Sequence, residues 1–269
     1  MHQSPSTPEQ LWQVLRTEAR AVAAAEPVLA SYLHNVILHQ SSLAEAVSFH
    51  LANLLDSNTV PALLLRDVCL EAMRSDPGIM TSLCRDINAS FERDAACDHY
   101  LMPLLYFKGF HALQAYRVAH WLWLQDRKML ALQIQNRMSE VFAVDIHPGA
   151  CIGGGIMIDH ATGVVIGETV VIEDDVSMLH AVTLGGSGKQ RGCDRHPKIR
   201  RGVLLSAGAK VLGAVQIGEG AKIGAGSVVM QDVPPHSTAA GVPARLVGRP
   251  AEDQPALDMD HELGDAFTS

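Results

Sequence analysis

The sequence is short of cysteine, of aromatic residues and of long apolar runs. Its five cysteines are odd in number and form no CxxC pair, which disfavours a disulfide framework or a clustered zinc site and is typical of reduced thiols in the cytoplasm. No apolar run approaches the roughly 18 residues that span a membrane, and no basic segment followed by an apolar run opens the chain, so we expect neither a membrane span nor a secretory signal. With 48% hydrophobic and 19% charged residues over 269 positions, the sequence predicts a globular cytoplasmic protein of one or two domains.

Charge is unevenly distributed along the chain. The net charge is −8, yet residues 185–249 carry ten Lys and Arg against three acids, so this segment is +7 and the remainder −15. The segment lacks the interleaved aromatics of a surface that binds nucleic-acid strands, so nucleic acid is not expected as a partner. A small polyanion is the favoured ligand, and a solvated basic face is the alternative.

Residues 1–141 are predicted to form a helical domain. The segment TPEQ at residues 7–10 provides an N-cap, a first-turn proline and a capping-box glutamine. A later helix, LLYFKGFHALQAYRVAHWLWLQ, is rich in aromatics and is predicted to belong to the core or to a subunit contact, with His111 as a packing residue. Asp94 lies in a polar loop before this helix, where an acid is usually solvated, so composition alone gives it no function.

From residue 146 onward, aliphatic residues recur every six positions, with a two-residue slip and a polar interruption at 185–198. The register positions are Ile146, Ile152, Ile158, Val164, Ile166, Ile172, Met178, Leu184, Ile199, Leu205, Val211, Ile217, Ile223 and Val229. A period this short predicts a solenoid in which each hexad is a short strand plus a turn, and three hexads make a coil of about 18 residues. The predicted fold class is therefore α+β: the helical domain, then a parallel β-helix over residues 142–248 with an expelled loop at 185–198, then a flexible polar tail at 249–269.

His160 and Asp159 follow the register residue Ile158, so both are expected outside the core, at the surface or at a corner of the coil. A histidine with an acid in reach suits general-base catalysis, because its pKa lies near neutral pH. Asp145 precedes Asp159 by nearly one coil, and coils stack about 4.8 Å apart, so Asp145 is predicted to orient the imidazole. Such a pair could take the proton of an alcohol and drive its attack on an acyl carbon.

Two other histidines, His147 and His180, are alternatives for the base, and His180 is expected to stack beneath His160. Three histidines also suggest a zinc site of the kind found in β-helical carbonic anhydrases, but no matching ligand spacing occurs, and no metal is expected. In the expelled loop, Arg195-His196 suits a carboxylate, since arginine binds one through two parallel hydrogen bonds, and a solvated loop is the alternative.

Several segments together resemble bacterial serine O-acetyltransferases: VDIHPGACIGGGIMIDHATGVVIGE, VTLGGSGK, DRHPKIR, AKIGAGS and PPHSTAAGVPAR, within residues 90–250. The resemblance implies a left-handed coil and acetyl transfer from acetyl-CoA to the hydroxyl of L-serine, the first step of cysteine synthesis. It implies that His160 is the general base and that Asp145 orients it. The positions that match the family's serine-binding residues are Asp94, Asp159, Arg195 and His196. The positions that match its CoA groove are Gly186, Ala207, Gly208 and Lys222.

The same resemblance implies partners. The β-helices of the family form trimers with the CoA groove between neighbouring subunits, two trimers pair through the helical domains, and L-cysteine is a feedback inhibitor that competes for the serine site. The family's tail often ends in isoleucine and docks into O-acetylserine sulfhydrylase. This chain ends in Ala266-Phe267-Thr268-Ser269, which argues against that partnership, and its loop between Gly188 and Arg195 is one residue longer than in familiar members.

Two other classes of function remain open at this point. A hexapeptide acetyltransferase for a sugar or antibiotic hydroxyl would share the fold, but a neutral sugar needs no set of charged side chains to hold a zwitterion. A non-catalytic scaffold trimer or a metal-dependent lyase is the third possibility. Metal analysis of the purified protein and activity in the presence of a chelator distinguish it from the first two.

Overall fold

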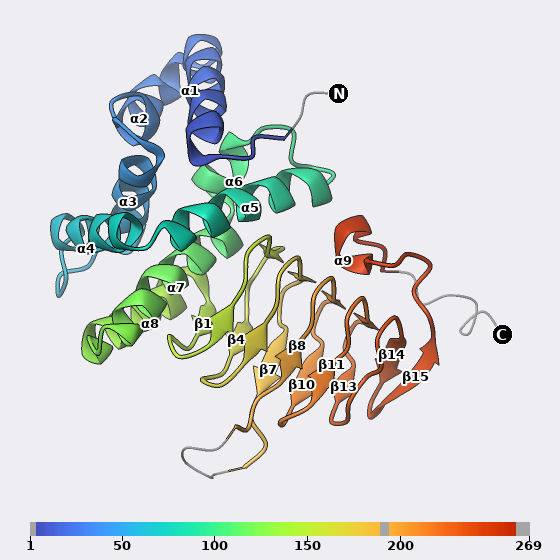
Figure 1. Ribbon diagram of the computed structural model, residues 1–269. Helices are drawn as coiled ribbons and strands as arrows, with labels where there is room; N and C mark the ends of the chain where they lie inside the picture. The colour runs from blue at the N-terminus through green and yellow to red at the C-terminus, as the bar shows by residue number, and fades with distance from the viewer. Residues whose placement is uncertain (1–3, 189–193, 262–269) are drawn as a thin grey trace.

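The computed structural model describes residues 4–188 and 194–261 and has two parts, a helical region and a solenoid of short strands (Figure 1). The main helices are α1 (Pro8–Ala25), α2 (Ala30–Leu33), α3 (Leu43–Leu54), α4 (Ala62–Ser75), α5 (Pro77–Arg93), α6 (Leu101–Tyr106), α7 (Lys108–Leu124) and α8 (Lys128–Phe142). The predicted N-cap of the first helix is confirmed, because Thr7 Oγ1 accepts a hydrogen bond from the Gln10 N–H at 3.2 Å.

The solenoid is built from strands of two to five residues. They are β1 (Val144–Ile146), β2 (Cys151–Ile152), β3 (Met157–Ile158), β4 (Val164–Ile166), β5 (Val171–Ile172), β6 (Ser177–Met178), β7 (Thr183–Gly185), β8 (Lys198–Ile199), β9 (Leu204–Leu205), β10 (Lys210–Leu212), β11 (Gln216–Ile217), β12 (Lys222–Ile223), β13 (Val228–Val229), β14 (Thr238–Gly241) and β15 (Ala244–Gly248). They form three sheets with the orders β1-β4-β7-β10-β13, β2-β5-β8-β11 and β3-β6-β9-β12-β14-β15, named here the β1, β2 and β3 faces. From β1 to β13, successive strands visit the three faces in turn, which confirms the predicted parallel β-helix (Figure 1). The solenoid ends in an antiparallel hairpin, β14–β15, on the β3 face.

The aliphatic register residues fill the interior of this β-helix. On the β3 face, Ile158, Met178, Leu205 and Ile223 are successive register partners, and all four side chains are buried. Burying an aliphatic side chain of this size stabilises the fold by about 1.5–3 kcal/mol. Because each coil contributes one such residue at each face, the six-residue period of the sequence corresponds directly to the interior of the fold.

A buried ion pair fastens the helical region to the β-helix. The Arg117 guanidinium on α7 donates to the Asp86 carboxylate on α5 at 2.7 Å, and both side chains are buried. The same carboxylate accepts the backbone N–H of Ile156, ahead of β3, at 3.0 Å. A buried charge requires this degree of hydrogen bonding, and the network fixes the middle of α5 and of α7 against the turn that precedes β3.

Beyond β15 the chain turns back over the β3 face as a short helix, α9 (Pro255–Asp258). Ala256 is fully buried, and its carbonyl accepts a hydrogen bond from the buried Ser177 hydroxyl at 2.7 Å. Part of the segment expected to be a flexible tail is therefore docked on the solenoid. Residues 262–269, which include the chain end relevant to the sulfhydrylase partnership, lie outside the described residues.

Two further observations concern residues 4–188 and 194–261. No helix in these ranges is long and apolar enough to cross a membrane. Their cysteines are free thiols: Cys69, Cys84, Cys97 and Cys151. The lengthened part of the expelled loop, residues 189–193, falls outside the described residues.

Candidate active site

The corner between β3 and β4 is longer than the corners stacked beside it. Ile158 pairs with Met178, and Val165 pairs with Thr183. Seven positions lead from Ile158 to Val165, whereas five lead from Met178 to Thr183, so the first corner contains two extra residues. This insertion is the structural origin of the two-residue slip in the sequence period.

His160 and Ala161 form this insertion, and both adopt a left-handed backbone, with φ of 56° and 58°. The Ala161 N–H donates to the Asp159 carbonyl at 2.6 Å, and the Thr162 N–H donates to the His160 carbonyl at 2.7 Å. Two consecutive three-residue turns at positive φ are strained, at roughly 1–3 kcal/mol for each residue. The turn carries His160 away from the coil, and its side chain is 74% exposed, as the register predicts.

A cavity of about 500 Å³ beside this turn brings together three of the predicted site residues. Asp94 enters from the end of α5, where its carboxylate accepts the Ala96 N–H at 2.8 Å. Asp159 and His160 enter from the end of β3, and 3.6 Å separates Asp159 Oδ2 from His160 Nε2. Two carboxylates next to a histidine suit an acceptor that carries both a hydroxyl group and an ammonium group.

The remainder of the cavity wall comes mainly from the start of α7 and the segment before it. Its aromatic and aliphatic lining includes Met102, Tyr106, Phe107, Phe110 and Met157. Lys108 and Thr162 also line the cavity, and the sequence patterns indicated no role for them. The cavity is therefore apolar over much of its wall, with charged groups concentrated near His160.

Arg195 and His196 lie at a different corner, between the β1 and β2 faces. The Arg195 guanidinium donates to Glu168 Oε2 at 2.9 Å. The His196 ring is 6% exposed, its Nδ1 lies 2.8 Å from Thr169 Oγ1, and burial, followed by the nearby Arg195 charge, lowers its pKa. Neither residue lines the cavity that holds Asp94, so one chain does not bring the four predicted serine-binding residues together.

Asp145 occupies the β1 face between these two corners. It pairs in register with Val165, and its Oδ1 accepts a hydrogen bond from Gln135 Nε2 of α8 at 2.6 Å. Within the described ranges, no hydrogen bond or ion pair joins Asp145 to His160. The first coil is 20 residues long, so the register partner of Asp145 lies five positions beyond His160.

The two histidines predicted as alternative bases, His147 and His180, have surroundings that differ from those of His160. His147 Nδ1 accepts the Gly149 N–H at 3.0 Å and closes the turn after β1, and burial lowers its pKa. The ring of His180 lies 6.0 Å from that of His160, centroid to centroid, in an edge-to-face arrangement. The Ala181 N–H, however, donates to the Thr162 carbonyl, so the insertion displaces His160 from the position directly above His180.

The residues predicted to contact CoA are spread over several coils of the β-helix. Gly186 begins the expelled loop, whereas Ala207 and Gly208 lie one coil beyond His180 at the same edge as His160. Lys222 on β12 is 1% exposed, and its ammonium group lies 3.1 Å from Asp260 Oδ2. The segment after α9 therefore covers the lysine in the described chain.

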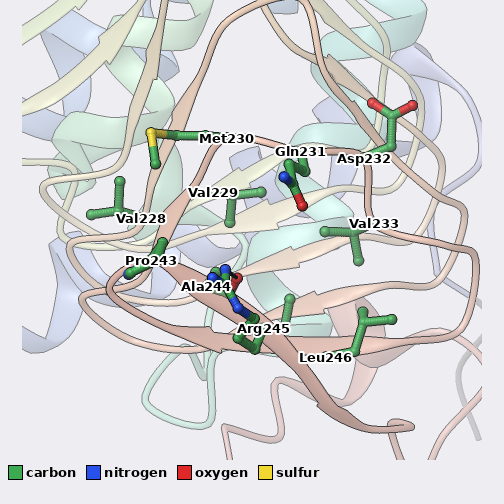
Figure 2. Close-up of a pocket in the computed structure, with 11 residues that line it drawn as sticks. Val228, Val229, Met230, Gln231, Asp232, Val233, Pro243, Ala244, Arg245 and Leu246 are labelled. Carbon is green, nitrogen blue, oxygen red and sulfur yellow. Dashed lines mark hydrogen bonds between the residues drawn. The ribbon is translucent and has the colours of Figure 1, made fainter.

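A second cavity, of about 320 Å³, lies at the far end of the solenoid (Figure 2). It is bounded by β13, the following turn and the β14–β15 hairpin, with Asp232 and Arg245 among its charged residues. All the predicted site residues belong to the described part of the chain, and none of them lines this cavity. In the described ranges, no group of three or more His, Cys, Asp or Glu side chains is placed to hold a metal ion.

A parallel β-helix of hexads that presents an exposed histidine among carboxylates defines a hexapeptide-repeat acyltransferase. Family models match at residues 11–115, for the N-terminal region of serine acetyltransferases, and at residues 196–231, for the bacterial transferase hexapeptide. The serine acetyltransferase of Salmonella typhimurium is 58% identical over 255 residues, covering 95% of this chain and 93% of that protein.

Solved structures agree with this match. A serine acetyltransferase in complex with cysteine superposes with a TM-score of 0.93 at 52% identity, covering 95% of this chain and 99% of that one. The Brucella abortus serine acetyltransferase in complex with coenzyme A superposes with a TM-score of 0.87 at 49% identity, covering 89% and 95%. The chain belongs to the serine acetyltransferase family.

Proposed function

We propose that this chain transfers the acetyl group of acetyl-CoA to the hydroxyl of L-serine, with His160 as the general base. The observation that supports this most strongly is the cavity in which Asp94, Asp159 and the exposed His160 meet. His160 removes the hydroxyl proton, and the serine oxygen bonds to the thioester carbonyl carbon. When the C–S bond of the tetrahedral intermediate breaks, the CoA sulfur takes the proton from the imidazolium. The products are O-acetyl-L-serine and CoA, and the histidine returns to its neutral form.

Asp94 and Asp159 hold the serine ammonium in this proposal, and Arg195 and His196 hold its carboxylate. Because Arg195 and His196 do not line the cavity of their own chain, a second copy of the chain supplies them in this proposal. A homotrimer of β-helices satisfies this requirement through a closed, cyclic arrangement. Asp145, at the β1 face between the corners, meets and orients His160 on the same assembly.

Acetyl-CoA lies along Gly186, Ala207, Gly208 and Lys222 in this proposal. The segment from residue 185 to 249 carries the excess positive charge that its phosphates require. A relative solved with coenzyme A supports this choice of co-substrate. Because Asp260 is paired with Lys222, the segment after α9 has to move before this lysine contacts the co-substrate.

We further propose that residues 1–141 form the oligomerisation domain, through which two trimers pair, and that the enzyme works in the cytoplasm. L-cysteine, which differs from L-serine only in sulfur for oxygen, fits the same charged groups and acts as a competing inhibitor. The relative solved with cysteine supports this assignment.

The test is release of free thiol from acetyl-CoA with and without L-serine, repeated with added L-cysteine. Thiol release that requires L-serine and falls with L-cysteine is the expected result. Sugars and antibiotics that carry hydroxyl groups serve as alternative acceptors in the same assay. If serine were inert and one of these were acetylated, the protein would be a hexapeptide acetyltransferase of different specificity.

A further inference from the structure

The first residues of α7 approach the backbone of β3 very closely, one residue before Asp159. A Cβ added to Gly109 would lie 2.0 Å from the carbonyl oxygen of Ile158, a separation that no side chain can occupy. Only glycine therefore permits α7 to begin at this point. The consequence is that Lys108, the first residue of α7, lies directly beside the corner that carries His160.

Lys108 contacts this corner through its side chain. Its ammonium group donates a hydrogen bond to Thr162 Oγ1. Thr162 directly follows the His160–Ala161 insertion, and its backbone N–H closes the second strained turn by donating to the His160 carbonyl. Lys108 thus holds the C-terminal end of the insertion against the helical region.

The N-terminal end of the insertion is held independently. The Asp159 N–H donates to the Met178 carbonyl of the next coil at 2.8 Å, and Ile158 packs beneath Gly109. A strained backbone persists only where its surroundings fix it from more than one side. The Lys108–Thr162 hydrogen bond is the side-chain contact that links the free side of the turn to α7.

We propose that Lys108 is a positioning residue for acetyl transfer: through Thr162 it keeps the strained His160–Ala161 turn in the form that presents His160 to the cavity. This inference rests on the proposed role of His160 as the general base. Lys108 exchanges no proton with substrate in this proposal. Its effect is on the fraction of time in which the imidazole lies within reach of the serine hydroxyl.

Direct binding of the serine carboxylate is the competing role for a lysine at this cavity, and the two roles predict different kinetics. A lysine that binds the substrate carboxylate changes the KM for serine when it is removed. Removing a lysine that positions the base changes kcat and leaves the KM values for serine and acetyl-CoA unchanged.

The experiment compares Lys108→Met, Lys108→Arg, Thr162→Val and the Lys108→Met/Thr162→Val double variant of the full-length protein. The control is Lys128→Met, since Lys128 is likewise the first residue of a helix, α8. It forms an ion pair with the exposed Asp126 and lies over the Trp123 ring, away from the cavity that holds His160. We expect Lys108→Met and Thr162→Val each to lower kcat about 10- to 100-fold, as a misplaced catalytic group does. The double variant should lose no more than either single variant, Lys108→Arg should recover most of kcat, and Lys128→Met should match the wild type.

Three results would overturn the proposal: a wild-type kcat in Lys108→Met, multiplicative losses in the double variant, or a raised KM for serine at unchanged kcat. If Lys108→Met does not fold, the proposal is decided by Thr162→Val, for which it requires the same loss of kcat at an unchanged melting temperature. The proposed function is tested separately by the wild type. An active wild type with a fully active Lys108→Met contradicts only the positioning role, whereas a wild type that ignores L-serine contradicts the function itself.

Discussion

Two inactive variants of this chain should restore activity to each other. Replacing His160 by Ala removes the proposed base at one corner, and replacing Arg195 by Ala removes the proposed partner of the serine carboxylate at the other. In a 1:1 mixture that assembles at random into trimers, half of the subunits retain His160, and half of their neighbours retain Arg195. About a quarter of the interfaces therefore carry an intact site, and we expect about a quarter of wild-type activity.

The assay is serine-dependent thiol release from acetyl-CoA by co-expressed chains that carry different affinity tags. Each variant alone defines the baseline, and the His160→Ala chain is expected at roughly 10²- to 10⁴-fold below wild type. The matched control combines His160→Ala with Asp159→Ala. These two residues share one cavity, so no arrangement of the mixed trimer contains an intact site.

The control pair should therefore remain at the baseline while the first pair recovers. Recovery of activity by both pairs would indicate that recombination between the two genes had re-formed wild-type chains. No recovery by the His160 and Arg195 pair, in trimers that demonstrably contain both tags, would refute the division of the site between subunits. Arg195 would then act within its own chain, or not on serine at all.

Three further predictions follow from particular contacts. Burial lowers the pKa of His50 and of His111 to about 4, so both are neutral in the folded protein. The unfolded chain binds these protons near pH 6.5, so the free energy of unfolding decreases as the pH falls toward 4. The decrease is about 2 kcal/mol for each histidine between pH 7 and 5. In denaturant titrations, His111→Gln should reduce this decrease. Replacing Asp260 by Asn removes the negative charge that faces Lys222 and should lower the KM for acetyl-CoA about fivefold, the equivalent of about 1 kcal/mol for a partly exposed pair; an unchanged or raised KM contradicts the proposed movement. Gly109→Ala should destabilise the protein by about 1–3 kcal/mol, as measured by its denaturation midpoint, and reduce kcat, because α7 must shift from the carbonyl of β3; a variant as stable and active as wild type would contradict this.

The β-helix could be predicted from the sequence because its interior repeats in every coil. Ile158 and Met178 occupy equivalent positions, so the same small set of aliphatic side chains recurs at a fixed period. The exposure of His160 followed from the same period, since a residue two places after a register position points away from the core. The slip in the period also indicated an insertion of two residues.

The backbone of that insertion could not be read from the sequence. Ala161 has no chemical feature that indicates a left-handed conformation, and the strain is maintained by contacts from another part of the chain. Gly109 carried a signal that could have been used, since an isolated glycine in a helical pattern often marks close packing. Its partner, the carbonyl of Ile158, is 49 positions away, so only the tertiary structure reveals the contact.

Two other features could not be predicted from the sequence: the docking of α9 and the position of the corner that holds Arg195. A polar, acidic segment is usually solvated, yet the docking of α9 depends on one small residue, Ala256, entering a buried notch. The loop before Arg195 separates it from its coil in sequence, so that its corner is fixed by the pairing of β7 and β8 with their neighbours and by side-chain contacts with Glu168 and Thr169. Both the docking of α9 and the position of Arg195 depend on tertiary contacts, which a local sequence pattern does not contain.

The most direct measurement is the turnover of His160→Ala with L-serine and acetyl-CoA, alongside its melting temperature and oligomeric state. Because His160 is exposed and lies outside the core, its replacement should leave both of these unchanged. If His160 is the general base, turnover falls by roughly 10²- to 10⁴-fold while the KM for acetyl-CoA stays near the wild-type value. Turnover near that of the wild type, in a protein that still requires L-serine, would contradict the assignment of the base and with it the chemistry proposed for the cavity.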